Sequence, residues 1–336
     1  MIHIKLERID MPTEDLFPSK HFDLEQLEDG VYVAIHKPSG AAYSNAGIID
    51  LGDQTIVIDA FNTLLAASDL RKAAETLTER TVDTLILTHA HTDHWFGAVI
   101  FDPSTTFIAS ETTNQEFLKG GQALLKDFQK PEEWDQWLKE TEDQLRMEED
   151  ERVRMGLQRA IERIRYTMAE MAGYKPRFPD QTFQEPLTFR GSKRYAELRS
   201  FGEGHSSDDA VVLLPEDKIA FIGDIGFFNL QPYMGSCDLE KWRGQLKFFH
   251  DSDFKILVPG HGPLGSKAEI TLQLEYFDVM EKLVGEVLEK DGSLEDALQI
   301  SLPEPFETWR LGSMGGFEVN VRYLYEHLGG EIPEEE

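Results

Sequence analysis

The chain is poor in the features that mark an extracellular or membrane protein. It contains one cysteine, Cys237, among 336 residues, and a single thiol excludes an intramolecular disulfide. No uninterrupted apolar stretch of the sequence approaches the roughly 18 residues that a membrane-spanning helix needs. The N-terminal segment is mixed and charged and lacks the apolar core of a secretory signal. We therefore expect a cytoplasmic protein that does not bind membranes.

Positive charge is also scarce. Lys and Arg number 33 against 62 Asp and Glu, a net charge of −29, and such a field repels nucleic acids and anionic membrane surfaces. The densest basic stretch, Arg152 to Arg165, is interleaved with Glu151 and Glu162, which is typical of a solvated helix face with intrahelical ion pairs. We expect a small-molecule substrate and no nucleic-acid partner.

Several common functional motifs are missing. The sequence has no G-x-x-x-x-G-K-[ST] loop, no C-x-x-C pair and no H-E-x-x-H helix. Nothing therefore indicates a nucleotide cofactor.

One loop is instead rich in metal-binding side chains. The segment Leu85 to Gly97 reads L-I-L-T-H-A-H-T-D-H-W-F-G, an apolar strand that ends in three histidines and one aspartate. His89 and His91 are two residues apart, so in an extended chain both imidazoles point to the same side. Asp93 and His94 follow after the chain has turned, where they can face a second ion. This pattern predicts a catalytic metal loop, with zinc as the first candidate.

Three later segments add ligands at the ends of other apolar runs. Gly204 to Asp209 (G-H-S-S-D-D) contains His205 and precedes the apolar run from Ala210. The run from Ile219 closes on Asp224, and the run from Ile256 closes on V-P-G-H-G with His261.

Taken together, T-H-A-H-T-D-H, G-H-S-S-D-D, F-I-G-D, V-P-G-H-G and an earlier strand that ends at Asp59 resemble the metallo-β-lactamase-fold hydrolase superfamily. The resemblance spans about residues 31–265. It implies a first metal bound by His89, His91 and His205, a second bound by Asp93, His94 and His261, and Asp224 as the bridge between them. It also implies that Asp59 is buried behind the ligands, where a carboxylate can fix histidine tautomers. A turn-forming role for Asp59 is the alternative.

This ligand set implies two Zn²⁺ ions, with Mn²⁺ or Fe²⁺ as alternatives. The carboxylates of Asp93 and Asp224, which we regard as the catalytic pair, and a bridging hydroxide leave such a site with one net positive charge. A centre of this kind lowers the pKa of bound water toward neutrality and stabilises the oxyanion that forms.

The expected fold is α/β, a four-layer αβ/βα sandwich with an inserted helical lid. We expect a single domain over residues 1–336, with an insertion at about 111–175 and a C-terminal helical extension at about 266–330. Expected strands are 31–36, 44–50, 55–59, 84–88, 106–109, 197–201, 210–214, 218–222 and 255–258. Expected helices outside the insertion are 64–78, 239–249, 267–290, 294–301 and 317–328.

Two amphipathic helices are predicted within the insertion. Their apolar residues recur at helical spacing: Trp134, Trp137, Leu138, Thr141 and Leu145, then Leu157, Ile161, Ile164, Met168 and Met171. Ordinary packing explains most of them. The sequence leaves open whether the insertion is a lid over the metals, a homodimer contact, or both.

Several large side chains follow the ligands directly and are expected to line a substrate pocket: Trp95, Phe96, Phe227, Phe228, Tyr233 and Met234. An aromatic wall favours a substrate with an acyl or ring portion. Tyr233 is also a candidate hydrogen-bond donor to an oxyanion. Cys237 is expected to be a loop thiol that does not bind metal. The C-terminal aromatic residues around Phe306 and Trp309 are expected to pack against a sheet.

The leading functional hypothesis is a dinuclear hydrolase that directs a metal-bound hydroxide at a small thioester, lactone or other ester. A phosphodiesterase or ribonuclease Z-like nuclease is the alternative, which the acidic charge disfavours. A β-lactamase and a di-iron oxidoreductase are less favoured. The usual β-lactamases lack a bridging aspartate such as Asp224, and the di-iron reductases carry a glutamate where this chain has His91.

Overall fold

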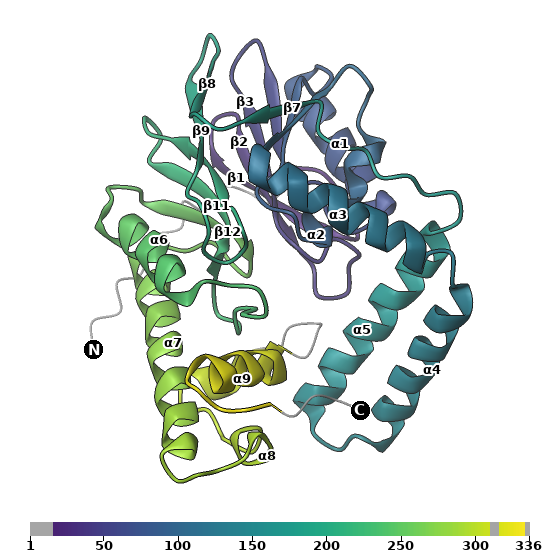
Figure 1. The fold of residues 1–336 in the computed structure, drawn as a ribbon. Coiled ribbons are helices and arrows are strands. Elements are labelled where there is room, and N and C mark those ends of the chain that lie inside the picture. Colours follow the sequence, from purple (N-terminus) through teal and green to yellow (C-terminus); the bar gives the residue numbers. More distant parts are fainter. Residues whose placement is uncertain (1–15, 310–315, 333–336) are drawn as a thin grey trace.

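Two β-sheets lie face to face at the centre of the computed structural model, which describes residues 16–309 and 316–332 (Figure 1). The seven-stranded sheet follows chain order and contains β1 (Phe22–Glu28), β2 (Val31–His36), β3 (Ala46–Asp50), β4 (Thr55–Ile58), β5 (Thr84–Ile86), β6 (Thr106–Ser110) and β7 (Gln181–Phe183). The five-stranded sheet has the order β12 (Ile256–His261), β11 (Ile219–Phe227), β10 (Ala210–Leu214), β9 (Tyr195–Ser200) and β8 (Leu187–Arg190).

The central strands are apolar on both faces because each sheet is covered twice. In β10, Val212 and Leu214 join the core between the two sheets. Val211 and Leu213, whose side chains point the other way, join a core beneath helices. β1 to β4 pair antiparallel and β4 to β7 pair parallel, so β4, β5 and β6 end at one edge of the sheet. That edge carries the predicted metal loop.

Helices form the two outer layers. Helices α1 (Leu64–Thr78) and α3 (Glu111–Asp127) pack their buried residues on the seven-stranded sheet. Helices α6 (Leu239–Asp251) and α7 (Lys267–Leu288) pack on the five-stranded sheet. The remaining helices are α2 (Thr92–Trp95), η1 (Phe96–Ile100), α4 (Pro131–Met147), α5 (Glu151–Glu170), α8 (Leu294–Ala297), η2 (Phe306–Thr308) and α9 (Gly316–His327). The four-layer αβ/βα sandwich is therefore confirmed.

The sequence missed β1, β7, β8 and α3. The β1 sequence, F-D-L-E-Q-L-E, carries three acidic residues, and among the described residues its strand pairs on one side only, with β2. Charged edge strands do not show the apolar pattern of buried ones. The strand expected at 218–222 extends instead to Phe227, because β11 continues to pair with β12 through two register shifts. Asp224 consequently lies within a strand and not after its end.

Three helices, α3, α4 and α5, occupy the region of the expected two-helix insertion, and α4 and α5 form a hairpin (Figure 1). The Arg165 guanidinium donates to Glu142 across the hairpin at 2.7 Å. On the sandwich side, Ile161 and Ile164 are buried. The Glu170 carboxylate accepts hydrogen bonds from the backbone N–H groups of residues 64 and 65 at the start of α1, at 2.8 and 3.2 Å. Glu170, at the C-terminal end of α5, thus caps the N-terminus of α1 and ties α5 to the sandwich.

A cluster of three aromatic rings, those of Phe96, Phe128 and Tyr174, also anchors the insertion. The rings of Phe96 and Tyr174 stack with centroids 4.1 Å apart, and Phe128 meets both edge-on. The Tyr174 hydroxyl donates to the Phe96 carbonyl at 2.8 Å. Because aromatic pairs and a satisfied hydroxyl both stabilise a buried contact, the insertion is a packed part of the molecule.

The C-terminal segment packs mainly on α7. Tyr276 stacks on Trp309 at 5.4 Å and meets Phe306 at 5.6 Å. Asn320 in α9 is fully buried, accepts from the Met234 backbone N–H at 2.9 Å and donates to the Pro232 carbonyl at 2.7 Å. Helix α9 therefore fixes the loop after β11. Residues 310–315 of the expected C-terminal extension lie outside the described residues. Among the described residues, no helix combines the length and the apolar character needed to cross a bilayer.

Gly97 provides a test of the packing beside the metal loop. A Cβ atom there would lie 2.1 Å from the Ala60 carbonyl oxygen and 2.3 Å from the Ala67 Cβ. We expect Gly97→Ala to lower the free energy of unfolding by about 1–3 kcal/mol or more, because backbone atoms around residue 60 must move to make room for the added methyl group. Gly120→Ala in α3 is the matched control. No described atom lies within 4 Å of its added Cβ, so a gain of up to about 1 kcal/mol is expected. Urea unfolding measures both, and equal stabilities would contradict the packing described.

Candidate metal centre

The structure brings all seven predicted ligands to one edge of the sandwich. Four come from the loop between β5 and η1, and the other three come from the five-stranded sheet or the segments that flank its strands. Trp95 closes the loop by donating its indole N–H to the Ala90 carbonyl at 2.8 Å. The Ser44 hydroxyl donates to the Asp93 carbonyl at 2.6 Å. These bonds hold a loop that would otherwise be free to open.

The first cluster contains His89, His91, His205 and Asp224. The Nδ1 atom of His91 lies 3.0 Å from the Nε2 atoms of both His89 and His205. One oxygen of Asp224 lies 3.5 Å from His89 Nε2 and 3.3 Å from His205 Nε2. One ligand atom from each residue can be chosen so that all lie within 4.8 Å of one another.

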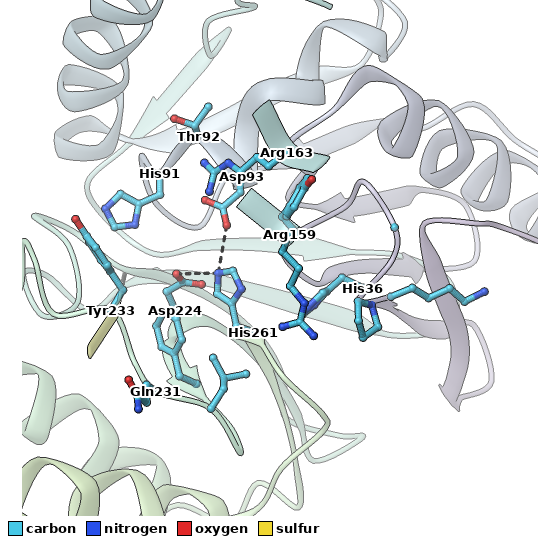
Figure 2. A pocket seen from close by; sticks show the side chains of 17 residues that line it. His36, His91, Thr92, Asp93, Arg159, Arg163, Asp224, Gln231, Tyr233 and His261 are labelled. Atoms are coloured by element: carbon cyan, nitrogen blue, oxygen red, sulfur yellow. Dashed lines mark ion pairs between the residues drawn. The ribbon is translucent and has the colours of Figure 1, made fainter. Parts of the chain in front are cut away.

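The second cluster contains Asp93, His94 and His261. The Nε2 atom of His261 lies 3.3 Å from Asp93 and 3.4 Å from Asp224, as the dashed lines in Figure 2 mark. The Nε2 atom of His94 lies 3.2 Å from Asp224 Oδ1. Asp224 therefore faces imidazoles of both clusters, with Oδ2 near His89, His205 and His261 and Oδ1 near His94, which is the position that a bridging ligand requires.

These spacings fit divalent ions. Donor atoms that share one zinc, each about 2.0–2.2 Å from it, lie about 3.0–3.5 Å from one another. Within the described residues, His94 Nε2 and Asp224 Oδ1 are buried atoms, and apart from their 3.2 Å contact with each other neither makes a hydrogen bond. A buried imidazole nitrogen and a carboxylate oxygen without other partners are unfavourable unless a cation satisfies them. The donor set of nitrogen and carboxylate oxygen suits zinc and also manganese or iron.

The electrostatics of the two clusters differ. Burial holds the pKa of His89 well below its usual range and lowers that of His205 to about 3, so both rings keep a free lone pair. Burial acts in the same direction at His261, but the Asp224 and Asp93 carboxylates outweigh it and raise its pKa to about 9. The carboxylates around the second cluster therefore favour a positive charge there more strongly than those around the first.

Asp59 lies behind the ligands and orients them. It is buried and accepts from His94 Nδ1 at 2.8 Å, from the Thr88 hydroxyl at 2.9 Å and from the Thr88 backbone N–H at 2.9 Å. With a proton fixed on Nδ1, the Nε2 lone pair of His94 faces the cluster. The position has a φ of 61°, an uncommon backbone conformation outside glycine that the surrounding contacts must hold.

Small residues and buried polar side chains support the remaining ligands. A Cβ atom at Gly260 would lie 1.8 Å from Asp224 Oδ1, so only glycine lets this carboxylate reach its place. Asn45 donates to the carbonyls of Pro259 and Gly262, on either side of His261, at 2.9 and 2.8 Å.

Asp209 supports the predicted ligand His205 by accepting a hydrogen bond from its backbone N–H at 2.8 Å. Burial raises the pKa of this aspartate to about 7. From the sequence, Asp209 was recognised only as part of the motif G-H-S-S-D-D, with no separate role.

The clusters open into a cavity of about 250 Å³. His91, Asp93, Asp224 and His261 form its floor, and Phe227, Leu230, Gln231 and Tyr233 are among its walls (Figure 2). Of the expected pocket residues, Tyr233 and Phe227 line this cavity. The ring of Tyr233 lies 5.8 Å from that of His91.

Four expected pocket residues do not line this cavity, so that expectation was wrong. Trp95, Phe96, Phe228 and Met234 are at most 1% exposed. The Trp95 ring packs at a tilt against Phe117, with centroids 4.2 Å apart. Phe96 belongs to the aromatic cluster with Phe128 and Tyr174, and Phe228 and Met234 belong to the core beneath α7. Neighbours in a strand or a short helix point in different directions, so a residue beside a ligand faces away from the ligand's side.

The sequence also missed much of the cavity wall. Tyr43, Arg159, Arg163 and Gln231 line it together with the segment 36–38. Gln231 is buried, and its Oε1 atom has no hydrogen-bond partner among the described residues. The interpretation of 152–165 as a solvated face was therefore wrong for Arg159 and Arg163, although Arg165 is an exposed, paired residue. The only sequence signal was two arginines at i, i+4 within the insertion.

Cys237 belongs to neither metal cluster. It is half-buried, and burial raises the pKa of its thiol to about 11. A thiol of this kind is unreactive at neutral pH.

Comparison with known proteins agrees with this geometry. Residues 39–261 match the family model described as the metallo-beta-lactamase superfamily. Among solved structures, a metallo-beta-lactamase from Pontibacter korlensis is similar with a TM-score of 0.52 and 18% identity, over 76% of this chain and 97% of that one. The metallo-beta-lactamase FIM-1 from Pseudomonas aeruginosa, in a mono-zinc form, is similar with a TM-score of 0.52 and 16% identity, over 76% and 94%. The family match covers well over half of the chain, which therefore belongs to the metallo-β-lactamase superfamily, a superfamily of metal-dependent hydrolases.

Proposed function

We propose that this enzyme is a dinuclear zinc hydrolase that acts on a small ester, lactone or thioester. The observation that carries the proposal is the pair of clusters that share Asp224 at the floor of a cavity of about 250 Å³. A structural metal site is closed on all sides by its ligands. Here His91, Asp93, Asp224 and His261 all border the cavity, as the ligands of a catalytic centre do.

In this proposal His89, His91 and His205 hold one ion, Asp93, His94 and His261 hold the other, and Asp224 joins the two. Bound divalent cations supply a strong nucleophile from water near neutral pH and polarise the carbonyl under attack. Asp93 faces His261 through Oδ2, which leaves Oδ1 to accept the proton of the attacking water. The Tyr233 hydroxyl is the candidate donor to the developing oxyanion.

The substrate class is argued from the cavity and from the charge of the whole protein. A cavity of about 250 Å³ suits a small molecule. Phe227 and Leu230 offer an apolar wall for an acyl portion. A net charge of −29 disfavours RNA and other polyanions. A small phosphodiester is the second candidate, and the specific observation in its favour is the presence of Arg159 and Arg163 in the cavity wall.

We expect protein purified without chelators, and loaded with zinc, to contain two ions per chain. His261→Ala should reduce this value to one, because it removes a ligand of the second cluster and leaves the three histidines of the first. Elemental analysis measures the stoichiometry, and circular dichroism controls for folding. One ion in the wild type together with an unchanged value in His261→Ala would show that the second cluster holds no metal.

Asp59→Asn should weaken binding of the second metal ion without removing any of its ligands. An amide has only one acceptor oxygen, so its NH2 group must face either the Thr88 backbone N–H or His94 Nδ1 and the Thr88 hydroxyl, and in either orientation the support of the His94 ring is weakened. Changes of this kind lower metal affinity by about 10- to 100-fold. Competition with a chromophoric chelator measures the affinity. Asp83→Asn, whose carboxylate accepts from the Thr55 backbone N–H at 2.8 Å away from the clusters, is the control. Equal affinity in both variants would contradict the role of Asp59.

A substrate panel tests the reaction. We expect the zinc-loaded enzyme to hydrolyse acyl thioesters, lactones or esters far faster than cephalosporins, phosphodiesters or RNA, with turnover abolished in His89→Ala and Asp224→Ala. A clear preference for phosphodiesters would reverse the order of the two candidates. Turnover by metal-free Asp224→Ala would refute the metal-dependent mechanism.

A further inference from the structure

The cavity wall beside the metal floor carries two arginines from the insertion. Arg159 and Arg163, here called the arginine pair, both extend from α5 into the cavity. Figure 2 shows Arg163 directed toward Asp93 and Arg159 directed toward His36. Residues four apart on a helix have Cβ atoms about 5–6 Å apart. Because both side chains also border the same cavity, a ligand inside it can contact both guanidinium groups.

The charges that border the cavity are unequal. Its described lining contains two carboxylates, Asp93 and Asp224, and both belong to the metal clusters. The lining cations are the arginine pair and Lys37. Lys37 pairs with Asp23 at 3.0 Å, so its charge is partly compensated. Two divalent ions would more than compensate the two carboxylates, and the arginine pair adds further positive charge to the lining.

The backbone that carries the arginine pair is fixed in place. The buried residues Ile161 and Ile164 alternate with the pair on α5, and Glu170 ties the end of this helix to the start of α1. The Arg163 guanidinium also lies over the Tyr43 ring, 5.7 Å from its centroid, an arrangement that orients a planar cation. A site on a rigid helix is better suited to specific recognition than a site on a loop.

We propose that the arginine pair is a subsite for an anionic group of the substrate, so that the enzyme selects small molecules that carry a carboxylate or a phosphate besides the bond that is cleaved. This inference extends the proposed hydrolase function and rests on it, because the subsite is said to hold part of the substrate of that reaction. Guanidinium groups bind both anions through paired hydrogen bonds. The apolar side chains of Phe227 and Leu230 border the same cavity and suit an apolar part of the same small molecule.

The acidic surface restricts which anions can reach this subsite. Charges separated by more than about 8 Å are largely screened at physiological ionic strength, so a small anion inside the cavity responds mainly to the arginine pair. A polyanion extends beyond the cavity and meets the field of a protein with a net charge of −29. The subsite is therefore compatible with the exclusion of RNA.

A purely structural role for the arginine pair makes a different prediction. Arg163 contributes to holding the pKa of Asp93 well below its usual range, although burial opposes it and His94 contributes more. If Arg163 served only to position Asp93, its substitution would lower zinc content and leave the discrimination between anionic and neutral ligands unchanged. Metal content must therefore be measured beside ligand affinity.

The test is equilibrium binding to the full-length, zinc-loaded protein by isothermal titration calorimetry. The probes are glutarate, its neutral diamide and glycerol 3-phosphate, which separate a carboxylate subsite from a phosphate subsite. We expect the wild type to bind one of the two anions at least about tenfold more tightly than the diamide, the gain of a charge-assisted hydrogen bond. Arg159→Gln and Arg163→Gln should each remove most of this preference, with two zinc ions retained.

Arg165→Gln is the matched control, because Arg165 lies on the same helix, is 60% exposed and pairs with Glu142 away from the cavity. It should bind all three probes as the wild type does. Anion affinity that is equal in the wild type and in both variants would overturn the proposal, and so would a loss of zinc with unchanged discrimination. The binding measurement does not require turnover, so it can be interpreted even if the hydrolase assignment fails. Failure of the subsite would leave hydrolysis of neutral esters unaffected.

Discussion

The buried carboxylate of Asp224 is the constraint on which the site depends. It is 3% exposed and lies within 3.2–3.5 Å of four imidazole nitrogens, those of His89, His94, His205 and His261. A carboxylate so deeply buried is strongly unfavourable unless positive charge surrounds it. The sandwich meets this requirement by bringing ligand segments of both sheets to one edge. Gly260, Asn45 and Asp59 then fix the geometry, each through a contact that a larger or apolar residue could not make.

The ligands could be predicted from the sequence because each stands beside a short apolar run, and such runs are recognisable as buried strands. The same reasoning located most strands and the helices that cover them. It failed for β1, whose acidic residues conceal a strand that, in the described part of the chain, pairs on one side only, and for α3. The extension of β11 beyond Asp224 was also missed, since register shifts between strands leave no signal in a single sequence.

The pocket could not be predicted in the same way. Adjacency in sequence suggested Trp95, Phe96, Phe228 and Met234, but neighbours along a strand or short helix alternate in direction, and these side chains entered the core. The residues that do line the cavity come from distant segments such as α5. Their positions depend on how the insertion docks through Glu170 and the Phe96–Tyr174 stack, which are tertiary contacts.

The insertion consequently links stability and recognition. Helix α5 caps α1 through Glu170, packs Ile161 and Ile164 into the molecule, and presents Arg159 and Arg163 to the cavity. A hinged lid would lower the precision with which two guanidinium groups meet a ligand, whereas a packed helix holds them at a fixed height above the metal floor. The strongly acidic exterior and the cationic cavity wall then act at different ranges. In the proposed function, the first repels extended polyanions, and the second acts on small molecules that have already entered.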